Sequence, residues 1–250
     1  MTTTQTQQDT PVVELKEVTK RYGGITAVNG VSLAVPPRSV VALVGDNGAG
    51  KSTISKIIAG AEHPDAGEVL VGGETRASID PTDVRKSGIE VVYQDLALAP
   101  NLDVATNLFL GRERVKAFGW LDRASMRKEA KELLGQLDVY VPSLTTKVER
   151  LSGGQRQAIA IARATHWAKS LVVMDEPTAA LGLRETAKVE ELILTLREQG
   201  KSVLVVSHNL EQVFRLSDQI LVMRRGNLVA DFQTQQTTTD TVVKTITGVI

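Results

Sequence analysis

The chain has 250 residues, with 29 Lys and Arg against 29 Asp and Glu, so its formal net charge is zero. This length can bury a substantial core, as one large domain or two small ones, and the neutral balance lacks the positive field of a general nucleic-acid or anionic-membrane binder. The chain contains no cysteine, which excludes disulfides and thiolate metal sites and fits a reducing compartment.

No stretch of the sequence predicts a targeting or membrane-spanning segment. The N-terminus, MTTTQTQQDTP, has neither the basic segment nor the apolar core of a signal peptide. The longest apolar runs are about six residues, against the ~20 needed to cross a bilayer. We therefore expect a soluble protein that contacts a membrane only through a partner. The Thr/Gln-rich ends, Thr2–Thr10 and Gln233–Thr241, are expected to be solvated tails.

The N-terminal region predicts a pair of short strands. They are expected at Val12–Val18 and Val31–Val35, around a turn at Tyr22-Gly23-Gly24. The aromatic face of Tyr22 could stack on adenine. Taken alone, this residue is more simply an ordinary tyrosine at the end of a strand.

A glycine-rich loop with one lysine follows the next strand. The β-branched run Ser39–Val44 predicts the strand, and Ile54–Ala59 predicts the helix after the loop. Strand, G-x-x-x-x-G-K-[ST] loop and helix together are typical of a nucleoside-triphosphate site, in which backbone N–H groups and the helix dipole hold phosphates. Lys51 would then reach the β- and γ-phosphates, and the Ser52 hydroxyl would bind Mg²⁺. The candidate nucleotide-binding residues are Gly45, Asp46, Asn47, Gly48, Ala49, Gly50, Lys51, Ser52 and Thr53.

Beyond this loop the sequence changes from strand to helix character. Strands are predicted at Gly67–Val71 and Ile89–Tyr93, with a short helix at Pro81–Lys86 between them and Gln94 after the second strand. Residues 95–163 are mostly helical and are interpreted as an insertion into an α/β scaffold.

The two helices predicted in this insertion are Leu102–Leu110 and Ser125–Leu137. In the second helix, Met126, Ala130, Leu133, Leu134 and Leu137 share one face. The charged residues around them, Arg127, Lys128, Glu129, Lys131 and Glu132, are interpreted as a solvated helix face.

A Ser-Gly-Gly turn precedes the helix predicted at Arg156–His166. In the string Leu151-Ser-Gly-Gly-Gln, the residues Ser152, Gly153, Gly154 and Gln155 offer bare N–H groups and a hydroxyl at a helix N-terminus. This is a second geometry suited to phosphate binding. The alternative is a plain helix N-cap.

Two carboxylates end the apolar strand predicted at Leu171–Met174. In a P-loop enzyme, the first, Asp175, would coordinate Mg²⁺ directly or through water. The second, Glu176, would polarise the attacking water as a general base. The alternative interpretation is a helix N-cap in the sequence Asp-Glu-Pro-Thr.

The remaining elements complete an alternating strand–helix order. A lone histidine at a strand end is usually structural, but His208 follows the next buried strand and could reach a γ-phosphate. The alternation predicts an α/β fold with a mainly parallel sheet covered by helices on both faces. The elements expected are a helix at Arg184–Arg197 with Val189, Leu192, Ile193 and Leu196 inward, a strand at Ser202–Val206, a helix at Asn209–Asp218, and a hairpin of Gln219–Met223 with Leu228–Phe232.

From Val12 to Phe232 the sequence resembles the ATP-binding subunit of ABC transporters. Six motifs occur in the family's order: the adenine-stacking aromatic (Tyr22), the Walker A loop (Gly45–Thr53), the Q-loop glutamine (Gln94), the LSGGQ signature (Leu151–Gln155), the Walker B strand (Leu171–Glu176) and the switch histidine (His208). The resemblance implies a P-loop NTPase (RecA-like) core with a mainly parallel sheet, an N-terminal antiparallel β subdomain and an inserted helical subdomain. It implies one ABC ATPase domain over 1–250, with 1–94 and 164–250 forming the core and 95–163 the helical subdomain.

The same resemblance implies how the protein works. ATP would close a head-to-tail homodimer, in which Ser152 and Gly154 of one subunit cover the ATP held by Lys51 of the other, and hydrolysis would reopen it. Catalytic roles are implied for Glu176, His208 and Gln94, and Mg²⁺ ligation for Ser52, Gln94 and Asp175. Gln94 and the helical subdomain would pass the motion to integral membrane permease subunits at the cytoplasmic face of the inner membrane.

The sequence also departs from the usual family pattern at one loop. Where most members have Ser-Ala-Leu-Asp, this chain has Ala179-Ala-Leu-Gly182, so the usual cross-talk between two ATP sites is in doubt. This loop and the stretch from Tyr93 through Gly111 resemble bacterial importers of ribose-, xylose- and fructose-type monosaccharides. That branch implies indirect work with an extracytoplasmic sugar-binding protein.

Two alternatives remain open on the sequence. One is a transporter ATPase for another cargo, such as an amino acid or a lipid. The other is a soluble ABC-type ATPase acting on ribosomes or DNA, although the chain has no tandem cassette, no heptads and no basic nucleic-acid footprint. We therefore expect no nucleic-acid partner.

Overall fold

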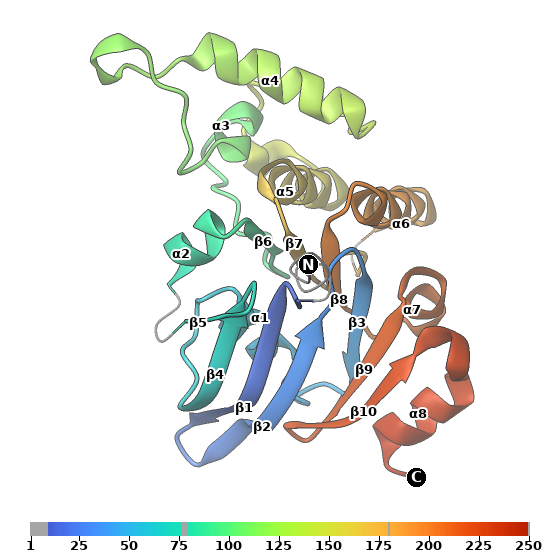
Figure 1. Ribbon diagram of the computed structural model, residues 1–250. Coiled ribbons are helices and arrows are strands. Elements are labelled where there is room, and N and C mark those ends of the chain that lie inside the picture. The colour runs from blue at the N-terminus through green and yellow to red at the C-terminus, as the bar shows by residue number, and fades with distance from the viewer. Residues whose placement is uncertain (1–9, 77–79, 180, 250) are drawn as a thin grey trace, which may run out of the picture. The chain divides into compact units, whose positions relative to one another are not determined.

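The computed structural model describes residues 10–76, 80–179 and 181–249. The chain forms two compact units (Figure 1). The first comprises Met1–Val91, Ala168–Glu176 and Ile193–Ile250, and the second comprises Val92–Trp167 and Pro177–Leu192.

The first unit is built on two sheets. A four-stranded antiparallel sheet has the order β2-β1-β4-β5, and a six-stranded sheet has the order β10-β9-β3-β8-β7-β6. In the larger sheet, β3 runs parallel to β8 and β9, and β7 runs parallel to β8. The strands are β1 (Val13–Tyr22), β2 (Ile25–Val35), β3 (Val40–Gly45), β4 (Ala66–Val71), β5 (Glu74–Arg76), β6 (Ile89–Val92), β7 (Leu171–Asp175), β8 (Ser202–Val206), β9 (Gln219–Arg224) and β10 (Asn227–Gln233).

Helices bury apolar side chains against both faces of the six-stranded sheet. Ile54, Ile57 and Ile58 of α1 (Lys51–Ile58) join a core that includes residues of β1, β2 and β4 together with β3, β7 and β8. On the other face, α7 (Leu210–Leu216) and α8 (Thr239–Thr247) pack on β3 and β9. Every residue of β3, β7 and β8 is buried, as expected for central parallel strands. A short helix, α2 (Pro81–Lys86), precedes β6.

The second unit is helical. Its core is formed by α3 (Val104–Leu108), α4 (Arg123–Gln136) and α5 (Gly153–Trp167), with 3₁₀ turns at Ala117–Gly119 and Val148–Arg150. Four of the five residues of the predicted inner face are buried in α4, namely Met126, Ala130, Leu133 and Leu134. The fifth, Leu137, follows the end of the helix and is half-buried. Helix α6 (Leu183–Glu198) begins in this unit and ends in the first.

The predicted fold class is confirmed. The chain is an α/β protein with a largely parallel sheet, an N-terminal antiparallel sheet and an inserted helical region. Within residues 10–76, 80–179 and 181–249, no helix is both long and apolar enough to cross a bilayer.

The expectation of a solvated tail at Gln233–Thr241 is wrong. Strand β10 continues to Gln233, Thr234 is buried in the following turn, and α8 begins at Thr239. Thr238 caps this helix, because its Oγ1 accepts a hydrogen bond from the Thr241 N–H. The repeated threonines were interpreted as a tail, but one of them caps a helix in which Val242 is completely buried. The tail expected at the other end falls almost wholly on residues 1–9, which lie outside the described residues.

Helix boundaries differ from the predicted ones where caps override periodicity. Helix α3 is shorter than Leu102–Leu110 because the Asp103 carboxylate accepts from the Thr106 N–H and starts the helix there. Helix α1 begins already at Lys51, directly after Gly50 in the left-handed region. In α6, Leu192 is half-buried rather than fully inward.

Candidate active site

The phosphate loop lies where β3 ends and α1 begins. Lys51, which is 8% exposed, donates from Nζ to the carbonyl oxygens of Gly45 at 2.7 Å and Asp46 at 2.8 Å. Burial lowers the pKa of the Lys51 ammonium, while the carboxylates of Glu176, Asp175 and Asp46 oppose that change. The lysine is thus held over the loop at the positive end of α1. This is the arrangement that a triphosphate requires.

Two glycines of this loop are required by close packing. A Cβ on Gly45 would overlap the carbonyl oxygen of Met223 in β9, and a Cβ on Gly50 would overlap the carbonyl oxygen of Ala27 in β2. Both glycines have positive φ, 149° and 104°. The loop is therefore fixed by the strands beside it and could not form with side chains at these two positions.

Asp175 ends β7 as a buried carboxyl group next to the first residues of α1. It is 6% exposed, and the Ser52 hydroxyl donates a hydrogen bond to its carboxyl group. Burial raises the pKa of the Asp175 carboxyl, against the effect of the Ser52 hydrogen bond. Its Oδ1 atom is buried and has no hydrogen-bond partner among the described residues. A buried carboxylate oxygen without a partner next to a serine hydroxyl fits the ligand preference of Mg²⁺.

Glu176 and His208 form a pair at the ends of β7 and β8. His208 Nδ1 lies 2.8 Å from Glu176 Oε1, and the Glu176 N–H donates to the Val206 carbonyl at 2.9 Å. Glu176 has a φ of 52°, a left-handed conformation that costs a residue other than glycine about 1 kcal/mol or more. Such backbone strain persists only where the surrounding structure holds it, and it clusters at active sites.

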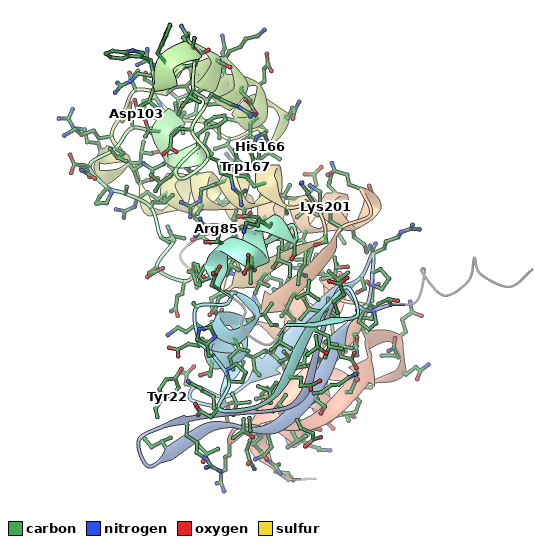
Figure 2. The ribbon with its side chains drawn as sticks, turned by 60° about the vertical axis from the view of Figure 1, so that its left-hand side comes forward. Tyr22, Arg85, Asp103, His166, Trp167 and Lys201 are labelled. Carbon is green, nitrogen blue, oxygen red and sulfur yellow. The ribbon has the colours of Figure 1, made fainter. Side chains whose placement is uncertain are left out.

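Tyr22 is the last residue of β1 (Figure 2). Its hydroxyl takes part in hydrogen bonds with Thr53 and Glu62, and Lys20 Nζ is 5.6 Å from the ring centre. Burial and the Glu62 carboxylate raise the pKa of the Tyr22 phenol. Tyr22 is 42% exposed, so part of it stays accessible to a ligand.

The sequence did not suggest Arg224 and Arg225, which flank the tip of the phosphate loop. Together with Asn227 they line a pocket of about 570 Å³ that also includes Asp46–Ala49 and the end of α8. The pairing of β3 with β9 explains their position: Gly45 is the register partner of Met223, so the residues after Met223 lie beside the loop that follows Gly45. The position of these two arginines could have been predicted if β3 and β9 had been known to be neighbouring parallel strands. The sequence alone does not reveal that strand order.

The second unit holds the segment that begins with Gln94. Gln94 is exposed, and the chain after it has positive φ at Leu96 and Ala97. Arg163 of α5 donates to both of their carbonyl oxygens, at 3.1 and 2.9 Å. The fully buried Asn107 side chain accepts from the Ala99 N–H and donates to the carbonyl oxygens of Ala99, Leu102 and Asp103. Asn107 therefore has a structural role that its motif alone did not reveal.

The signature turn in this unit is a capping box. The Ser152 N–H donates to Gln155 Oε1 at 3.0 Å, and the Gln155 N–H donates to Ser152 Oγ at 3.2 Å. Outside its chain neighbours and its own helix backbone, no heavy atom of the described residues lies within 4 Å of a Cβ built on Gly153. The nearest such atom to a Cβ on Gly154 is 3.5 Å away, on Leu181. Neither glycine has a positive φ. The turn leaves bare N–H groups at the start of α5.

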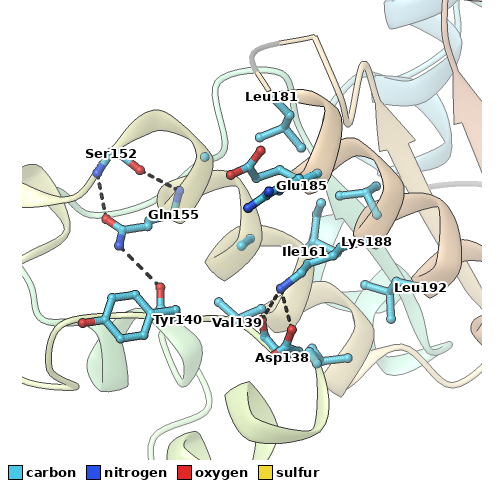
Figure 3. Close-up of a pocket in the computed structure, with 15 residues that line it drawn as sticks. Asp138, Val139, Tyr140, Ser152, Gln155, Ile161, Leu181, Glu185, Lys188 and Leu192 are labelled. Carbon is cyan, nitrogen blue, oxygen red and sulfur yellow. Dashed lines mark hydrogen bonds and ion pairs between the residues drawn. The ribbon is translucent and has the colours of Figure 1, made fainter.

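A pocket of about 380 Å³ lies beside this turn (Figure 3). Apolar side chains of α5 and α6, including Ile161 and Leu192, form its walls. The Lys188–Asp138 ion pair lies on one side, and Gln155 donates from Nε2 to the Tyr140 carbonyl on another. The signature residues thus form one edge of a largely apolar pocket.

The departure at Ala179–Gly182 lies in the same unit, although Ala180 is outside the described residues. A Cβ on Gly182 would lie 2.8 Å from Glu185 Oε2. Since that atom is the end of a flexible side chain, a larger residue here would only need Glu185 to move. The packing does not require glycine at this position.

The structure thus brings together Tyr22, the phosphate loop, Asp175, Glu176 and His208 within the first unit. Gln94 and Ser152–Gln155 belong to the second. The fold and the phosphate loop define a P-loop nucleoside triphosphatase.

Comparisons with known proteins identify the family. Residues 28–179 match the model of the ABC transporter family. The chain is 42% identical over 237 residues to the xylose/arabinose import ATP-binding protein XylG of Sulfolobus acidocaldarius, covering 95% of this chain and 94% of the relative. It is 41% identical over 245 residues to the fructose import ATP-binding protein FrcA of Rhizobium meliloti, with the same coverage. In structure the chain resembles the ATP-binding cassette MJ0796, which was solved in a dimeric post-hydrolysis state bound to ADP and Pi. The TM-score is 0.79 and the sequence identity 30%, and the match covers 89% of this chain and 98% of that one.

The chain belongs to the ABC transporter family and is one of its ATP-binding and ATP-hydrolysing subunits. The predicted resemblance is confirmed, including its monosaccharide-importer branch.

Proposed function

We propose that this chain energises the import of a monosaccharide. The proposal is supported by the two relatives, which are import ATP-binding proteins for xylose/arabinose and for fructose and align with 95% of the chain. The cargo would be selected by the permease and an extracytoplasmic sugar-binding protein. The chain itself would bind and hydrolyse ATP at the cytoplasmic face of the inner membrane, attached peripherally to the permease.

The Glu176–His208 pair is the main observation that supports the proposed mechanism of ATP hydrolysis. Glu176 acts as the general base that takes a proton from the attacking water. His208, 2.8 Å from Glu176 Oε1, orients that carboxylate and contacts the γ-phosphate. Lys51 and the N–H groups of the loop neutralise the phosphates, and Tyr22 stacks on the adenine. The strained Glu176 backbone keeps the carboxylate in this position before ATP binds.

Ser52 and Asp175 would hold Mg²⁺, with Gln94 as a further ligand. The buried Asp175 Oδ1 without a partner and the adjacent Ser52 hydroxyl support this assignment. When bound, the ion would neutralise charge on the phosphate oxygens. Among the described residues there is no group of three or more His, Cys, Asp or Glu side chains able to hold a metal, so phosphate oxygens and water would supply the other ligands.

The signature turn acts on a second copy of the chain. In the proposed head-to-tail homodimer, Ser152, Gly153, Gly154 and Gln155 of one subunit cover the ATP held at Lys51 of the other. The packing supports this role, because a Cβ would fit at Gly153 without any contact and at Gly154 with ordinary contacts only, so packing among the described residues does not require either glycine. Residues 95–163, as the helical subdomain, and Gln94 would transmit dimer closure to the permease, while 1–94 and 164–250 form the ATPase core.

Glu176→Gln tests the catalytic part. The variant should bind ATP as the wild type does, hydrolyse it at a rate lowered on the order of 10²-fold or more, and elute as an ATP-dependent dimer in gel filtration. Glu211→Gln, which removes a carboxylate from an exposed ion pair with Arg215, is the matched control and should keep full activity. Wild-type hydrolysis by Glu176→Gln would exclude Glu176 as the base.

The transport part is tested by isolating the protein from detergent-solubilised membranes of its own source. Copurification of a polytopic permease and a sugar-binding protein would support import and point to the cargo. Copurification with ribosomes or DNA, without a permease, would overturn the transport proposal and leave the ATPase standing. A permease with a non-sugar binding protein would correct only the cargo.

A further inference from the structure

A hairpin at residues 114–122, between α3 and α4, exposes large apolar side chains. Phe118 is 99% exposed and Trp120 75%, and Val115 and Leu121 are also exposed. Figure 1 shows this segment looping out from the helices beside the start of α4. Exposed single apolar residues are common on proteins, but two aromatic and two aliphatic side chains within seven residues form a patch.

The hairpin has an ordered backbone. Lys116 N–H donates to the Trp120 carbonyl at 2.7 Å, and Asp122 N–H donates to the Arg114 carbonyl at 2.7 Å. Phe118 and Gly119 both have positive φ, 65° and 77°, and close the turn. The turn thus places Phe118 at the tip with no contact to cover it. We name residues 115–121 the aromatic tip.

Cations line the exposed side of the helix that follows. Arg123, Arg127 and Lys131 are spaced i, i+4, i+8 along α4, with Lys128 beside them, and all four are exposed. Within the described part of the chain none of these four forms an ion pair. Of the two glutamates on the same helix, Glu129 is bound to Arg114 and His166, and Glu132 is exposed, so α4 carries four cations against two carboxylates. We name Arg123, Arg127, Lys128 and Lys131 the cationic stripe.

This concentration of charge is local. The whole chain is neutral, with 29 cationic and 29 anionic side chains, whereas the cationic stripe has four charges without partners next to an apolar tip. Aromatic and aliphatic side chains beside Lys and Arg are the composition of protein surfaces that enter the headgroup region of a bilayer. A stable protein interface instead buries roughly 20–30 residues a side. Four apolar side chains on a narrow hairpin are too few for that.

We propose that the aromatic tip and the cationic stripe bind the surface of an anionic bilayer directly. Trp120 and Phe118 enter the headgroup region, and the guanidinium and ammonium groups of α4 pair with lipid phosphates. The charged face of α4 is therefore more than the solvated face expected from its sequence. The contact requires no permease, so it can fail or succeed independently of the proposed sugar import.

Binding to protein-free vesicles tests the proposal. The full chain should float with vesicles of phosphatidylcholine and phosphatidylglycerol, and much less with phosphatidylcholine alone. The emission of Trp120, obtained by subtracting the spectrum of Trp120→Phe, should shift to the blue and be quenched by bromine-labelled lipid. Trp167 donates from Nε1 to the Leu108 carbonyl in the helical core and contributes a constant background.

Two variants separate the two parts of the surface. Phe118→Ser with Trp120→Ser should lose binding while keeping wild-type basal ATP hydrolysis, which shows that the fold is intact. Arg127→Gln with Lys131→Gln should lower vesicle partitioning on the order of twentyfold. The matched controls change the exposed Ile25 to Ser, and Lys16 with Lys86 to Gln, on the first unit. Both controls should bind as the wild type does.

Three results would overturn the proposal: no binding to anionic vesicles, binding that the tip and stripe variants retain, or binding that appears only when the permease is present in the bilayer. The last result would identify the aromatic tip as a docking site for protein.

Discussion

The two glycine-containing turns that open α1 and α5 differ in what their glycines serve. In the phosphate loop, Gly45 and Gly50 are needed by the fold itself, because the Met223 and Ala27 carbonyls leave no space for a Cβ. In the signature turn, a Cβ on Gly153 would enter open space and one on Gly154 would make only ordinary van der Waals contacts with Leu181 and Glu185. Neither glycine has a positive φ. The first turn is thus built into its sheet. The second leaves its backbone N–H groups bare, as the proposed contact with a second subunit requires.

The energetic consequences differ in the same way. The site at the end of β3 and β7 carries costs that folding must offset: a buried charge at Asp175, a desolvated Lys51 and a strained Glu176. The signature turn is held by a capping box, which stabilises its helix. Substitutions in the two turns should therefore separate folding from activity.

The largest effect is expected for Gly45→Ala. The new methyl group meets a backbone carbonyl that cannot move without distorting β9, so we expect a loss of roughly 2–4 kcal/mol in the free energy of unfolding and no ATP binding. Gly48→Ala is the control: it has positive φ but free space, and should cost only about 1–2 kcal/mol. Urea unfolding measures both, and equal costs would show that the close approach to Met223 is unimportant.

Gly153→Ala should reverse this result. Its stability should stay within about 0.5 kcal/mol of wild type, because the methyl group enters open space. ATP hydrolysis should fall at least about tenfold, equivalent to about 1.4 kcal/mol of lost contact, since the bare N–H approach is blocked. Unfolding curves and steady-state hydrolysis test this together. Full activity in this variant would contradict a ligand-facing role for the turn.

Asp175→Asn should stabilise the folded protein and reduce its rate of ATP hydrolysis. The raised pKa of Asp175 means that the folded state favours the protonated carboxyl. The stability gained in this way is fully present below the ordinary pKa of 3.8 and is lost as the pH rises through the raised pKa of the folded protein. At neutral pH, burial of the ionised Asp175 carboxyl destabilises the folded wild type, and the variant has no charge at this position. We expect a gain of about 1 kcal/mol, a rise of roughly 2–4 °C in Tm, with hydrolysis strongly reduced.

The pH dependence provides the check on this prediction. The difference in Tm between the variant and the wild type should shrink as pH falls below the raised pKa, because the wild-type carboxyl is then neutral. A difference that is the same at acidic and neutral pH would assign the gain to something other than charge burial.

Ser152→Ala tests the capping box, and its expected effects on folding and on hydrolysis are both modest. Losing the side-chain acceptor should cost about 1 kcal/mol. Thr238→Ala, which removes the equivalent cap of α8, is the matched control and should cost a similar amount. Hydrolysis should fall only for Ser152→Ala. If both variants hydrolyse ATP normally, Ser152 serves as a cap and nothing more.

Much of the fold could be predicted because its central strands are short, apolar and bounded by recognisable turns. Ser202–Val206 was predicted at the limits observed for β8, and Asp175 and Glu176 were found because they end an uninterrupted apolar run. Helix α8 was not predicted because its cap, Thr238, and two residues of its first turn, Thr239 and Thr241, are threonines, which resemble a low-complexity tail.

Other parts of the site depend on which strands are neighbours in the sheet, and the order of elements along the chain does not determine this. Arg224 and Arg225 lie beside the phosphate loop because β9 pairs with β3. The register partners in this pairing, Gly45 and Met223, are 178 residues apart along the chain. The pairing of His208 with Glu176 likewise depends on β7 and β8 being neighbours. The role of Gln94 stays a prediction.

The open space at Gly153 also has a genetic consequence. A chain altered at Gly45 should unfold and be degraded, so a second intact gene copy would compensate and the mutation would be recessive. A chain altered at Gly153 should persist, pair with normal chains and occupy the transporter without turning over. Mutations in the signature turn should therefore be dominant, and overproduction of such a chain should block sugar uptake in cells that also make the normal protein.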